Sequence, residues 1–454
     1  MVAIHDRTVT LEFLHEQAHK IWTEPTLFSV TESLWSPGAI ELFRRGRALE
    51  RIFWANPQRV GFGTAYAISA SGEDRFTQTA AIWDDLLRSA VIADPGGQGG
   101  PMLFGGFAFD PTRESTALWQ SFPAGRMALP ELMFTFTSGE TWLTTNLIVR
   151  PGRDPDPDLR RVQNVLDLLL SADMGPVRLP KVRVAEELRQ AGDWQNDVAH
   201  AAAAVGRNEL EKVVLARAIR LRADGPFDEA AALERLIADF PGCKVFAIGR
   251  GDRCFLGATP ERLVAVQGDR VQTMVLAGSA RRGQNASDDD QQGHELLASS
   301  KNRHEHAVVL NTVLESLRGA VDRLEYADTP GLLKLGNVQH LCTPITGHLS
   351  AGGSLMALVQ RLHPTPAVGG RPRETALALI RVVEDLDRGW YAGPVGCLDY
   401  RGEGEFAVAL RSALVANDEA ILFAGCGIMA DSDPLREYEE SGLKFRPMLS
   451  ALGA

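Results

Sequence analysis

The order of strand-like and helical segments limits the fold of this chain more than any other feature of its sequence. Residues 212–278 hold a series of short apolar runs typical of strands, and Gly268-Asp269 between two of them indicates a hairpin turn. Helical periodicity then predicts one long helix over residues 288–324 and two shorter ones, before three further strands between residues 391 and 428. Strands and helices come in blocks rather than in βαβ alternation, so we predict an α+β fold with large antiparallel sheets.

The first 190 residues carry weaker signals than the rest of the chain. Strand-like runs interrupted by glycine occupy residues 60–70 and 102–110, with helical segments between and after them. We expect residues 1–190 to contribute strands and helices to the same α+β fold. Residues 191–454, where the signals are densest, are expected to form the functional region.

Composition narrows the class of protein and its partners. The chain has 454 residues, 45% of them apolar, and a net charge of −11, which does not favour nucleic acid or an acidic membrane as partner. Its five cysteines are scattered without C-x-x-C spacing, which indicates a reducing compartment. Neither a signal-peptide core nor a run of 18 apolar residues occurs. We therefore predict a cytoplasmic protein without a membrane anchor.

The segment Gly425–Lys444 holds the densest group of candidate functional residues. Gly425 and Gly427 end an apolar run, where missing side chains would let a ligand approach the backbone. Asp433-Pro434 is typical of a helix start, because Asp can cap the free N–H groups and Pro is tolerated in the first turn. The helix carries three charged residues on one face, Glu437, Glu440 and Lys444. This pattern suggests a small anion with a divalent metal, although this segment taken alone is explained better by an ordinary surface ion pair.

Lys212 and Glu261 are candidates for proton transfer. Lys212 begins an apolar strand, and burial of a lysine lowers its pKa toward the range of a general base. A lysine that protects a sheet edge is the alternative. Glu261 follows a proline turn, where it could be a fixed carboxylic acid or part of a turn salt bridge.

Glu305 lies on the apolar face of the predicted long helix. It shares that face with Val309, Val313 and Leu317. A carboxylate on a buried face needs a partner, and a divalent cation held by carboxylates of two helices would be one. A salt bridge along the helix is the alternative. The neighbouring H-x-H spacing is weak evidence for zinc.

Three further polar residues stand in apolar or glycine-rich surroundings. Arg411 interrupts a strand, where a guanidinium could bind a carboxylate ligand in a bidentate manner. His340 and Tyr391 place polar groups in similar surroundings. Structural hydrogen bonding is as good an explanation for these two as ligand contact.

Nine sequence blocks from Asp193 to about Leu452 resemble, in the same order, those of the chorismate-utilising enzymes. This family contains the isochorismate, salicylate, anthranilate and aminodeoxychorismate synthases. The blocks are KVVLAR, ATPERLV, LAGSARRG, KNRHEH, LHPTPAVGG, WYAGPVG, ALRSALV, AGCGI and SDPLREYEESGLK. The resemblance implies a central sandwich of large antiparallel sheets with helices outside, and makes residues 191–454 the chorismate-binding catalytic region.

The resemblance also implies roles for individual residues. Lys212 matches the base that activates water for attack at C2 of chorismate, and Glu261 matches the acid that protonates the departing C4 hydroxyl. Glu305 and Glu440 match ligands of Mg²⁺, and Glu437 matches a carboxylate that reaches the metal through water. Positions that hold the substrate's carboxylates or line its ring pocket are Gly278, Ser279, His340, Tyr391, Arg411, Gly425, Gly427 and Lys444.

Two positions bear on which member of the family the chain resembles most. Ala367 stands where members that release pyruvate or use ammonia usually carry threonine, so it favours isochorismate synthase. Asn302 replaces a glutamate common in anthranilate and salicylate members, which puts an auxiliary metal contact in doubt. We expect Mg²⁺-dependent isomerisation of chorismate to isochorismate by a monomer or homodimer, for menaquinone biosynthesis.

Several alternatives stay open at this point. The first is a salicylate synthase or an isochorismate synthase of a siderophore pathway. A component of anthranilate or aminodeoxychorismate synthase is less favoured, because no amidotransferase unit is fused to the chain. An inactive binding subunit is also possible in principle, but the matched base, acid and metal positions, Lys212, Glu261, Glu305 and Glu440, are all present.

Overall fold

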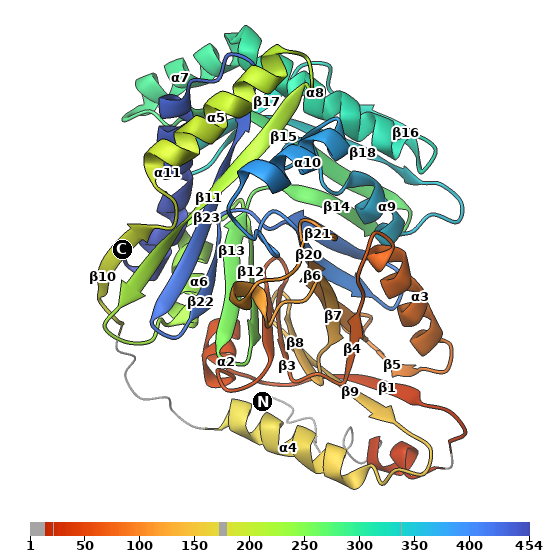
Figure 1. Ribbon diagram of the computed structural model, residues 1–454. Helices are drawn as coiled ribbons and strands as arrows, with labels where there is room; N and C mark the ends of the chain where they lie inside the picture. The colour runs from red at the N-terminus through yellow and green to blue at the C-terminus, as the bar shows by residue number, and fades with distance from the viewer. Residues whose placement is uncertain (1–13, 21, 172–178, 337) are drawn as a thin grey trace.

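The computed structural model describes residues 14–20, 22–171, 179–336 and 338–454 (Figure 1). Within these residues the chain forms two large sheets, which pair mostly in the antiparallel sense. Helices cover the outer faces of both sheets (Figure 1). The predicted α+β sandwich is confirmed.

The larger sheet has thirteen described strands. Twelve follow the order β10 (Val182–Glu187), β11 (Lys212–Ala223), β23 (Glu419–Ile428), β22 (Ser412–Ala416), β13 (Arg253–Thr259), β12 (Lys244–Arg250), β2 (Arg51–Trp54), β3 (Gln58–Phe62), β8 (Leu132–Phe136), β9 (Thr141–Val149), β1 (Thr26–Ser33) and β5 (Val91–Ala93). The short strand β19 (Gly370–Arg371) pairs with β11 beside the main path. Only the β1–β5 pair is parallel among the described strand pairs.

The smaller sheet has ten described strands. Nine follow the order β16 (Val321–Tyr326), β18 (Val338–Leu349), β15 (Arg270–Arg281), β14 (Arg262–Gln267), β21 (Gly404–Val408), β20 (Pro394–Asp399), β6 (Met102–Phe107), β7 (Gly125–Leu129) and β4 (Tyr66–Ser69). The tenth strand, β17 (Gly331–Lys334), pairs with β18. The turn at Gly268-Asp269 joins β14 and β15 as predicted.

Strands from the first 190 residues continue both sheets. β2 pairs with β12 in the larger sheet, and β6 pairs with β20 in the smaller one. Backbone hydrogen bonding therefore crosses from one region of the sequence to the other in both layers. The boundary between a region 1–190 and a region 191–454 stays a prediction.

The helices correct one expectation from the sequence. The predicted helix over residues 288–324 is two helices, α7 (Ala286–Ala298) and α8 (Ser300–Leu317), followed by strand β16. Ser299 separates them, because its backbone is extended and its hydroxyl accepts the N–H of Asn302 as the N-cap of α8. Further described helices are α2 (Ala39–Arg45), α3 (Arg75–Leu87), α4 (Asp156–Leu170), α5 (Ala191–Gly206), α6 (Glu229–Asp239), α9 (Leu355–Leu362), α10 (Arg373–Val383) and α11 (Pro434–Leu452), with a short helical segment at residues 14–18 and a 3-10 helix at Ala117–Trp119.

The apolar core has two main layers. One lies between the sheets, where Leu215 and Phe255 of the larger sheet join the same buried cluster as Val275 and Phe406 of the smaller one. The other lies between the larger sheet and its outer helices, where Leu422 clusters with residues of α6 and α11. Burial on both faces explains why many strands read as continuous apolar runs rather than alternating ones. No helix among the described residues is long and apolar enough to cross a membrane.

Candidate active site

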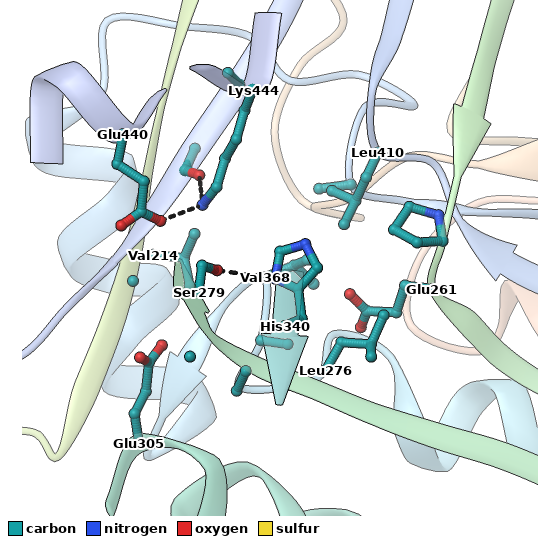
Figure 2. A pocket seen from close by; sticks show the side chains of 18 of the residues that line it. Val214, Glu261, Leu276, Ser279, Glu305, His340, Val368, Leu410, Glu440 and Lys444 are labelled. Atoms are coloured by element: carbon teal, nitrogen blue, oxygen red, sulfur yellow. Dashed lines mark hydrogen bonds and ion pairs between the residues drawn. The ribbon is translucent and has the colours of Figure 1, made fainter. Parts of the chain in front are cut away.

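One pocket gathers the candidate residues from distant parts of the chain. It lies where β11, β15 and β23 meet α8 and α11 (Figure 2), and every residue singled out from the sequence lines it. Figure 2 shows Glu440 and Glu305 on one side, with their carboxyl groups directed toward the space between them, and Glu261 on the other side. The grouping is an observation of geometry, and the roles of these residues stay predictions.

Helix α11 supplies one wall. It begins at Asp433-Pro434 as predicted, and the Asp433 carboxylate accepts the N–H of Arg436 at 2.9 Å. Glu440 pairs with Lys444, with 2.8 Å between Oε1 and Nζ, and Lys444 also donates to the Gly425 carbonyl at 2.9 Å. Burial acts to raise the pKa of Glu440, but the charge and hydrogen bond of Lys444, together with the charge of Arg411, lower it overall, so this carboxyl is ionised. The wall thus presents a fixed anion and a fixed cation.

Glu437, one turn earlier on α11, is more deeply buried. The Ser432 hydroxyl donates to its Oε1 at 2.8 Å, and Lys301 lies 4.0 Å away. Burial first, and then the charge of Glu440, raise the pKa of Glu437 to about 7. A carboxyl group with a raised pKa beside a second carboxylate is a position that a bound cation would stabilise in its ionised form.

The part of the pocket that faces α11 comes from β11 and α8. Lys212 Nζ donates to Glu305 Oε1 at 2.7 Å, and the lysine side chain is 2% exposed. Gly427 makes this approach possible, because a Cβ there would lie 2.7 Å from both Glu305 Oε1 and Lys212 Cε. Arg217, five residues later on β11, points to the opposite face of the strand, where its Nε donates to the Ser441 hydroxyl at 2.7 Å.

The residues present fit a hard divalent cation. Glu437, Glu440 and the Cys426 thiol have potential ligand atoms within 4.8 Å of one another. Burial raises the pKa of Cys426 well above its ordinary value, and the thiol donates to the Glu437 carbonyl, so sulfur is a poor ligand here. Carboxylate oxygens remain, and Glu305 adds another from the facing helix (Figure 2). Such oxygen donors suit Mg²⁺ rather than zinc.

Glu261 is the buried carboxyl group on the far side of the pocket. Its backbone is held by Thr259 and by Val408, whose N–H donates to the Glu261 carbonyl at 3.0 Å. Burial raises the pKa of Glu261 to about 7, although the charge of Lys212 acts in the opposite direction. A carboxyl group with this pKa can carry a proton near neutral pH, as a general acid requires.

Arg411 and His340 form a linked pair between the two ends of the pocket. Arg411 lies between β21 and β22 with φ of +48° and is buried, and it donates to His340 Nε2 at 3.4 Å. The other ring nitrogen, Nδ1, is 2.9 Å from the Ser279 hydroxyl. Burial, and then the charges of Arg411 and Lys444, lower the pKa of His340, which keeps the imidazole neutral. None of the described carboxylates forms an ion pair with Arg411, so its charge is available to an anionic ligand.

Backbone irregularities shape the space around these side chains. A bulge in β15 between Leu276 and Ser279 contains Gly278, whose φ is +80°. A Cβ at Gly278 would lie 3.1 Å from Asn302, and one at Gly425 would lie 3.2 Å from the Tyr391 hydroxyl. Ala367 lines the pocket from the loop before β19. Glycine at 278 and 425 therefore preserves room for a ligand.

Two charged lining residues were missed by the sequence analysis. Arg388 is buried against Glu384, donates to the Val214 and Val368 carbonyls, and thereby fixes the pocket floor. The i,i+4 spacing of these two residues ahead of Gly389 was the available signal. Lys301 lies in the KNRHEH block and was not assigned a role, yet it lines the pocket near Glu437.

A family model described as "Chorismate binding enzyme" matches residues 12–453. The chain belongs to the chorismate-binding enzymes. Its similarity to relatives extends over whole chains: it is 36% identical to the isochorismate synthase MenF of Bacillus subtilis over 100% of this chain and 99% of that protein. It is 38% identical to the salicylate biosynthesis isochorismate synthase of Pseudomonas aeruginosa over 89% of this chain and 85% of that protein.

Solved structures of chorismate-binding enzymes share the fold. The menaquinone-specific isochorismate synthase MenF of Escherichia coli aligns with a TM-score of 0.82 and 25% identity, over 98% of this chain and 99% of that one. Anthranilate synthase component I of Streptococcus pneumoniae aligns with a TM-score of 0.66 at 18% identity, over 100% of this chain and 99% of that one, a likeness in fold alone. Because the fold serves relatives with different names, the reaction must be argued from the site.

Proposed function

We propose that this protein is a magnesium-dependent isochorismate synthase that adds water at C2 of chorismate with loss of the C4 hydroxyl. The observation that carries the proposal is that one pocket holds a buried lysine and a buried glutamate, Lys212 and Glu261, which could serve as base and acid. Displacement of an allylic hydroxyl by water needs a base where water attacks and an acid where hydroxyl leaves. The full-length similarity to isochorismate synthases supports the same reaction.

In this proposal Lys212 takes a proton from the attacking water. Its amine is held by Glu305 at 2.7 Å, so the lysine is fixed in position before substrate binds. If Glu305 turns to another partner, its hydrogen bond to Lys212 is lost, and the lysine amine can face the attacking water. Glu305 would then serve both as the holder of Lys212 and as a metal ligand.

Glu261 gives its proton to the leaving hydroxyl. Burial supplies the protonated carboxyl at neutral pH, and the backbone contacts at Thr259 and Val408 hold it in place. Lys212 and Glu261 thus divide the two proton transfers between a base and an acid whose surroundings differ.

Glu305 and Glu440 would hold Mg²⁺ directly, with Glu437 behind them through water. When bound, the ion neutralises the carboxylate of the substrate and orients it. Arg411, Lys444 and the backbone at Gly425 and Gly427 would bind the remaining carboxylate oxygens. The buried Arg411 guanidinium is suited to this because it lacks a described carboxylate partner.

The proposal favours isochorismate as the released product, with menaquinone biosynthesis as the pathway. Ala367 at the pocket supports release before pyruvate elimination, since the resemblance associates threonine there with elimination or ammonia use. The whole-length match to MenF of Bacillus subtilis favours the menaquinone pathway. The match to a salicylate-pathway isochorismate synthase keeps a siderophore role as the second candidate.

The direct test is to incubate the enzyme with chorismate and Mg²⁺ and to separate the products. Isochorismate without pyruvate or fluorescent salicylate is expected. Stoichiometric pyruvate would overturn the assignment in favour of salicylate synthase. Deleting the gene in its own organism separates the pathways, because menaquinone content falls only if the protein supplies that route.

A further inference from the structure

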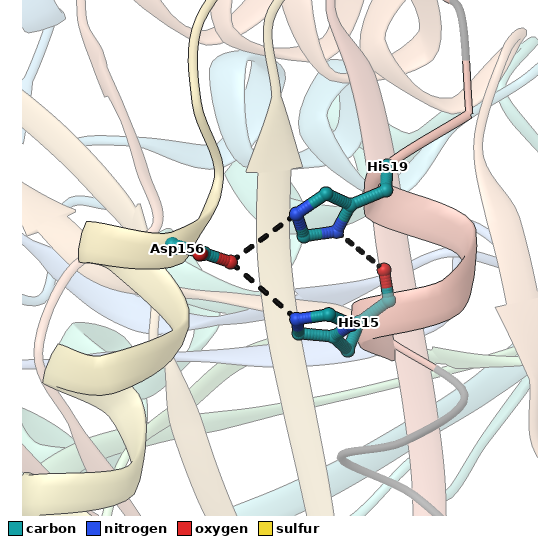
Figure 3. Close-up of side chains that lie close together, drawn as sticks. All are labelled: His15, His19 and Asp156. Atoms are coloured by element: carbon teal, nitrogen blue, oxygen red, sulfur yellow. Dashed lines mark hydrogen bonds and ion pairs between the residues drawn. The ribbon is translucent and has the colours of Figure 1, made fainter.

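A second cluster of metal-binding residue types lies far from the pocket, beside the N-terminal edge of the larger sheet. His15 and His19 lie on the first described helical turns, and Asp156 lies at the start of α4. Figure 3 shows both imidazole rings directed toward the Asp156 carboxylate. Their potential ligand atoms lie within 4.8 Å of one another. We propose that these residues form a site for Zn²⁺ or a similar transition-metal ion, separate from the magnesium site.

The distances agree with tetrahedral coordination. His15 Nε2 lies 3.5 Å from Asp156 Oδ1, and His19 Nε2 lies 3.2 Å from the same oxygen. Two ligands bound at about 2.0–2.1 Å in a tetrahedral site are separated by roughly 3.3–3.4 Å. Each imidazole nitrogen therefore lies from the shared carboxylate oxygen at about the separation of two ligands of one ion, and water would complete the fourth position.

The hydrogen bonding of His19 fixes the form of the ring that binds metal. Its Nδ1 lies 2.8 Å from the His15 carbonyl, which can only accept, so this nitrogen carries the proton and donates. Nε2 of the neutral ring then presents a lone pair toward Asp156. A histidine that donates its other N–H to a backbone carbonyl is the usual arrangement in metal sites.

An ion pair without metal explains the cluster less well. The two rings stack with centroids 4.2 Å apart, so two protonated imidazoles would repel each other, and among the described residues one carboxylate pairs with them. Arg160 already lies 3.7 Å from the other oxygen of that carboxylate, which further reduces its capacity for two more cations. One divalent ion would satisfy both neutral rings and the carboxylate together.

The packing beneath the cluster holds the ligands in position. Leu14 and Ala18, on the neighbouring face of the helix, are buried with Leu159 of α4 and with Phe28 and Val30 of β1. This contact sets the helix against α4 independently of any ion. A bound metal would then tie the N-terminal segment to α4 and stabilise the edge of the larger sheet.

The test is Zn²⁺ and Co²⁺ binding to enzyme kept saturated with Mg²⁺, so that the carboxylate site is occupied. The parent should bind about one more equivalent of Zn²⁺ than His15→Gln or His19→Gln, and should show the visible Co²⁺ bands of a tetrahedral site. His348→Gln is the matched control, because His348 pairs with Asp269 at 2.9 Å on an exposed hairpin without a second histidine near Asp269 among the described residues.

Stability gives a second readout. Zn²⁺ should raise the Tm of the parent and of His348→Gln, and should leave the Tm of the two cluster variants unchanged. All these variants should retain chorismate turnover, since none lines the pocket. Equal Zn²⁺ stoichiometry and equal Co²⁺ spectra in the parent and in both cluster variants would overturn the proposal.

Discussion

Two lysine–glutamate pairs line the active-site pocket, and they are built in different ways. Lys444 and Glu440 stand four residues apart on α11, with 2.8 Å between charged atoms. Lys212 and Glu305 lie 93 residues apart in the sequence, on β11 and α8, with 2.7 Å between Nζ and Oε1. The first pair forms wherever the helix forms, whereas the second requires that the sheet and α8 are assembled.

The two pairs also differ in burial. The side chains of Lys444 and Glu440 are 15% and 36% exposed, whereas those of Lys212 and Glu305 are 2% and 15% exposed. Water screens the helix pair more, so its Coulombic contribution to stability is smaller. We infer that the buried pair controls proton transfer and that the helix pair orients ligands for metal and substrate.

Replacing Lys212 should have the largest effect. Lys212→Ala should lower kcat by about 10²–10⁴-fold, the range for loss of a general base. Lys181→Ala, at an exposed lysine outside the pocket, is the control. Steady-state isochorismate formation measures both variants, with circular dichroism to verify folding. An unchanged kcat for Lys212→Ala would remove the lysine from the mechanism.

Glu440→Gln should lower activity at limiting Mg²⁺ by at least about tenfold. Loss of residues that only hold metal ligands in place already costs about tenfold to a hundredfold, and loss of a ligand itself should cost no less. Excess Mg²⁺ should restore part of the activity, because the amide remains a weak oxygen ligand. Glu439→Gln is the matched control, since Glu439 is the exposed neighbour on the same helix. The role of Glu440 as ligand is contradicted if both variants need the same Mg²⁺ concentration as the parent.

Arg411→Lys should raise KM for chorismate about tenfold to a hundredfold, because a charge-assisted hydrogen bond contributes about 1.5–3 kcal/mol. Lysine keeps the charge but cannot bind a carboxylate through two parallel N–H groups. Initial rates over a range of chorismate concentrations measure the effect, with exposed Arg436→Lys as control. A variant that lowers kcat but leaves KM unchanged would argue against a substrate clamp.

The pH dependence should reveal Glu261 as the acid. Its pKa of about 7 lies above the ordinary value of 4.5, so the protonated fraction falls as pH rises through about 7. At higher pH, kcat/KM should therefore decline by up to about tenfold per pH unit. The same raised pKa means that this group's contribution to stability is full below pH 4.5 and is lost between pH 4.5 and about 7.

Glu261→Gln is the control for this profile. It should be much less active than the parent and should lack the alkaline decline assigned to the carboxyl group. If the residual activity of this variant still declines at alkaline pH, the decline belongs to another group. Glu437, with a pKa of about 7, is the first such group to examine.

The smallest effect is expected at the start of α11. Asp433→Ala removes the side chain that caps this helix and should destabilise the protein by about 1 kcal/mol. Chemical denaturation measures the loss. Asp431→Ala, at an exposed aspartate before the helix, should have less effect. A loss of activity as large as that of Glu440→Gln would show that the cap also positions the ligands.

Local patterns allowed much of the site to be predicted. The helix start at Asp433-Pro434, the face shared by Glu437 and Glu440, and the hairpin at Gly268-Asp269 depend on neighbouring residues, and the structure confirms them. The resemblance to known blocks then named residues that all line one pocket.

The break at Ser299 is a local feature, a cap on the N–H of Asn302, but the continued helical periodicity around it indicated one long helix. Features that depend on distant contacts could not be predicted. The bond from Lys212 to Glu305 depends on the close approach at Gly427. The fixing of the pocket floor by Arg388 depends on carbonyls of β11 and the 365–368 loop, to which no local sequence signal points.

The most direct test uses Mn²⁺ in place of Mg²⁺. Its binding is measured from the electron paramagnetic resonance signal of the Mn²⁺ that stays free in solution. Glu305 and Glu440, which belong to two separately built pairs, are expected to bind one ion together. Glu305→Gln and Glu440→Gln should each weaken Mn²⁺ binding, while Glu439→Gln should bind like the parent. Parent-like Mn²⁺ affinity in either ligand variant, with the protein folded, would contradict the shared site.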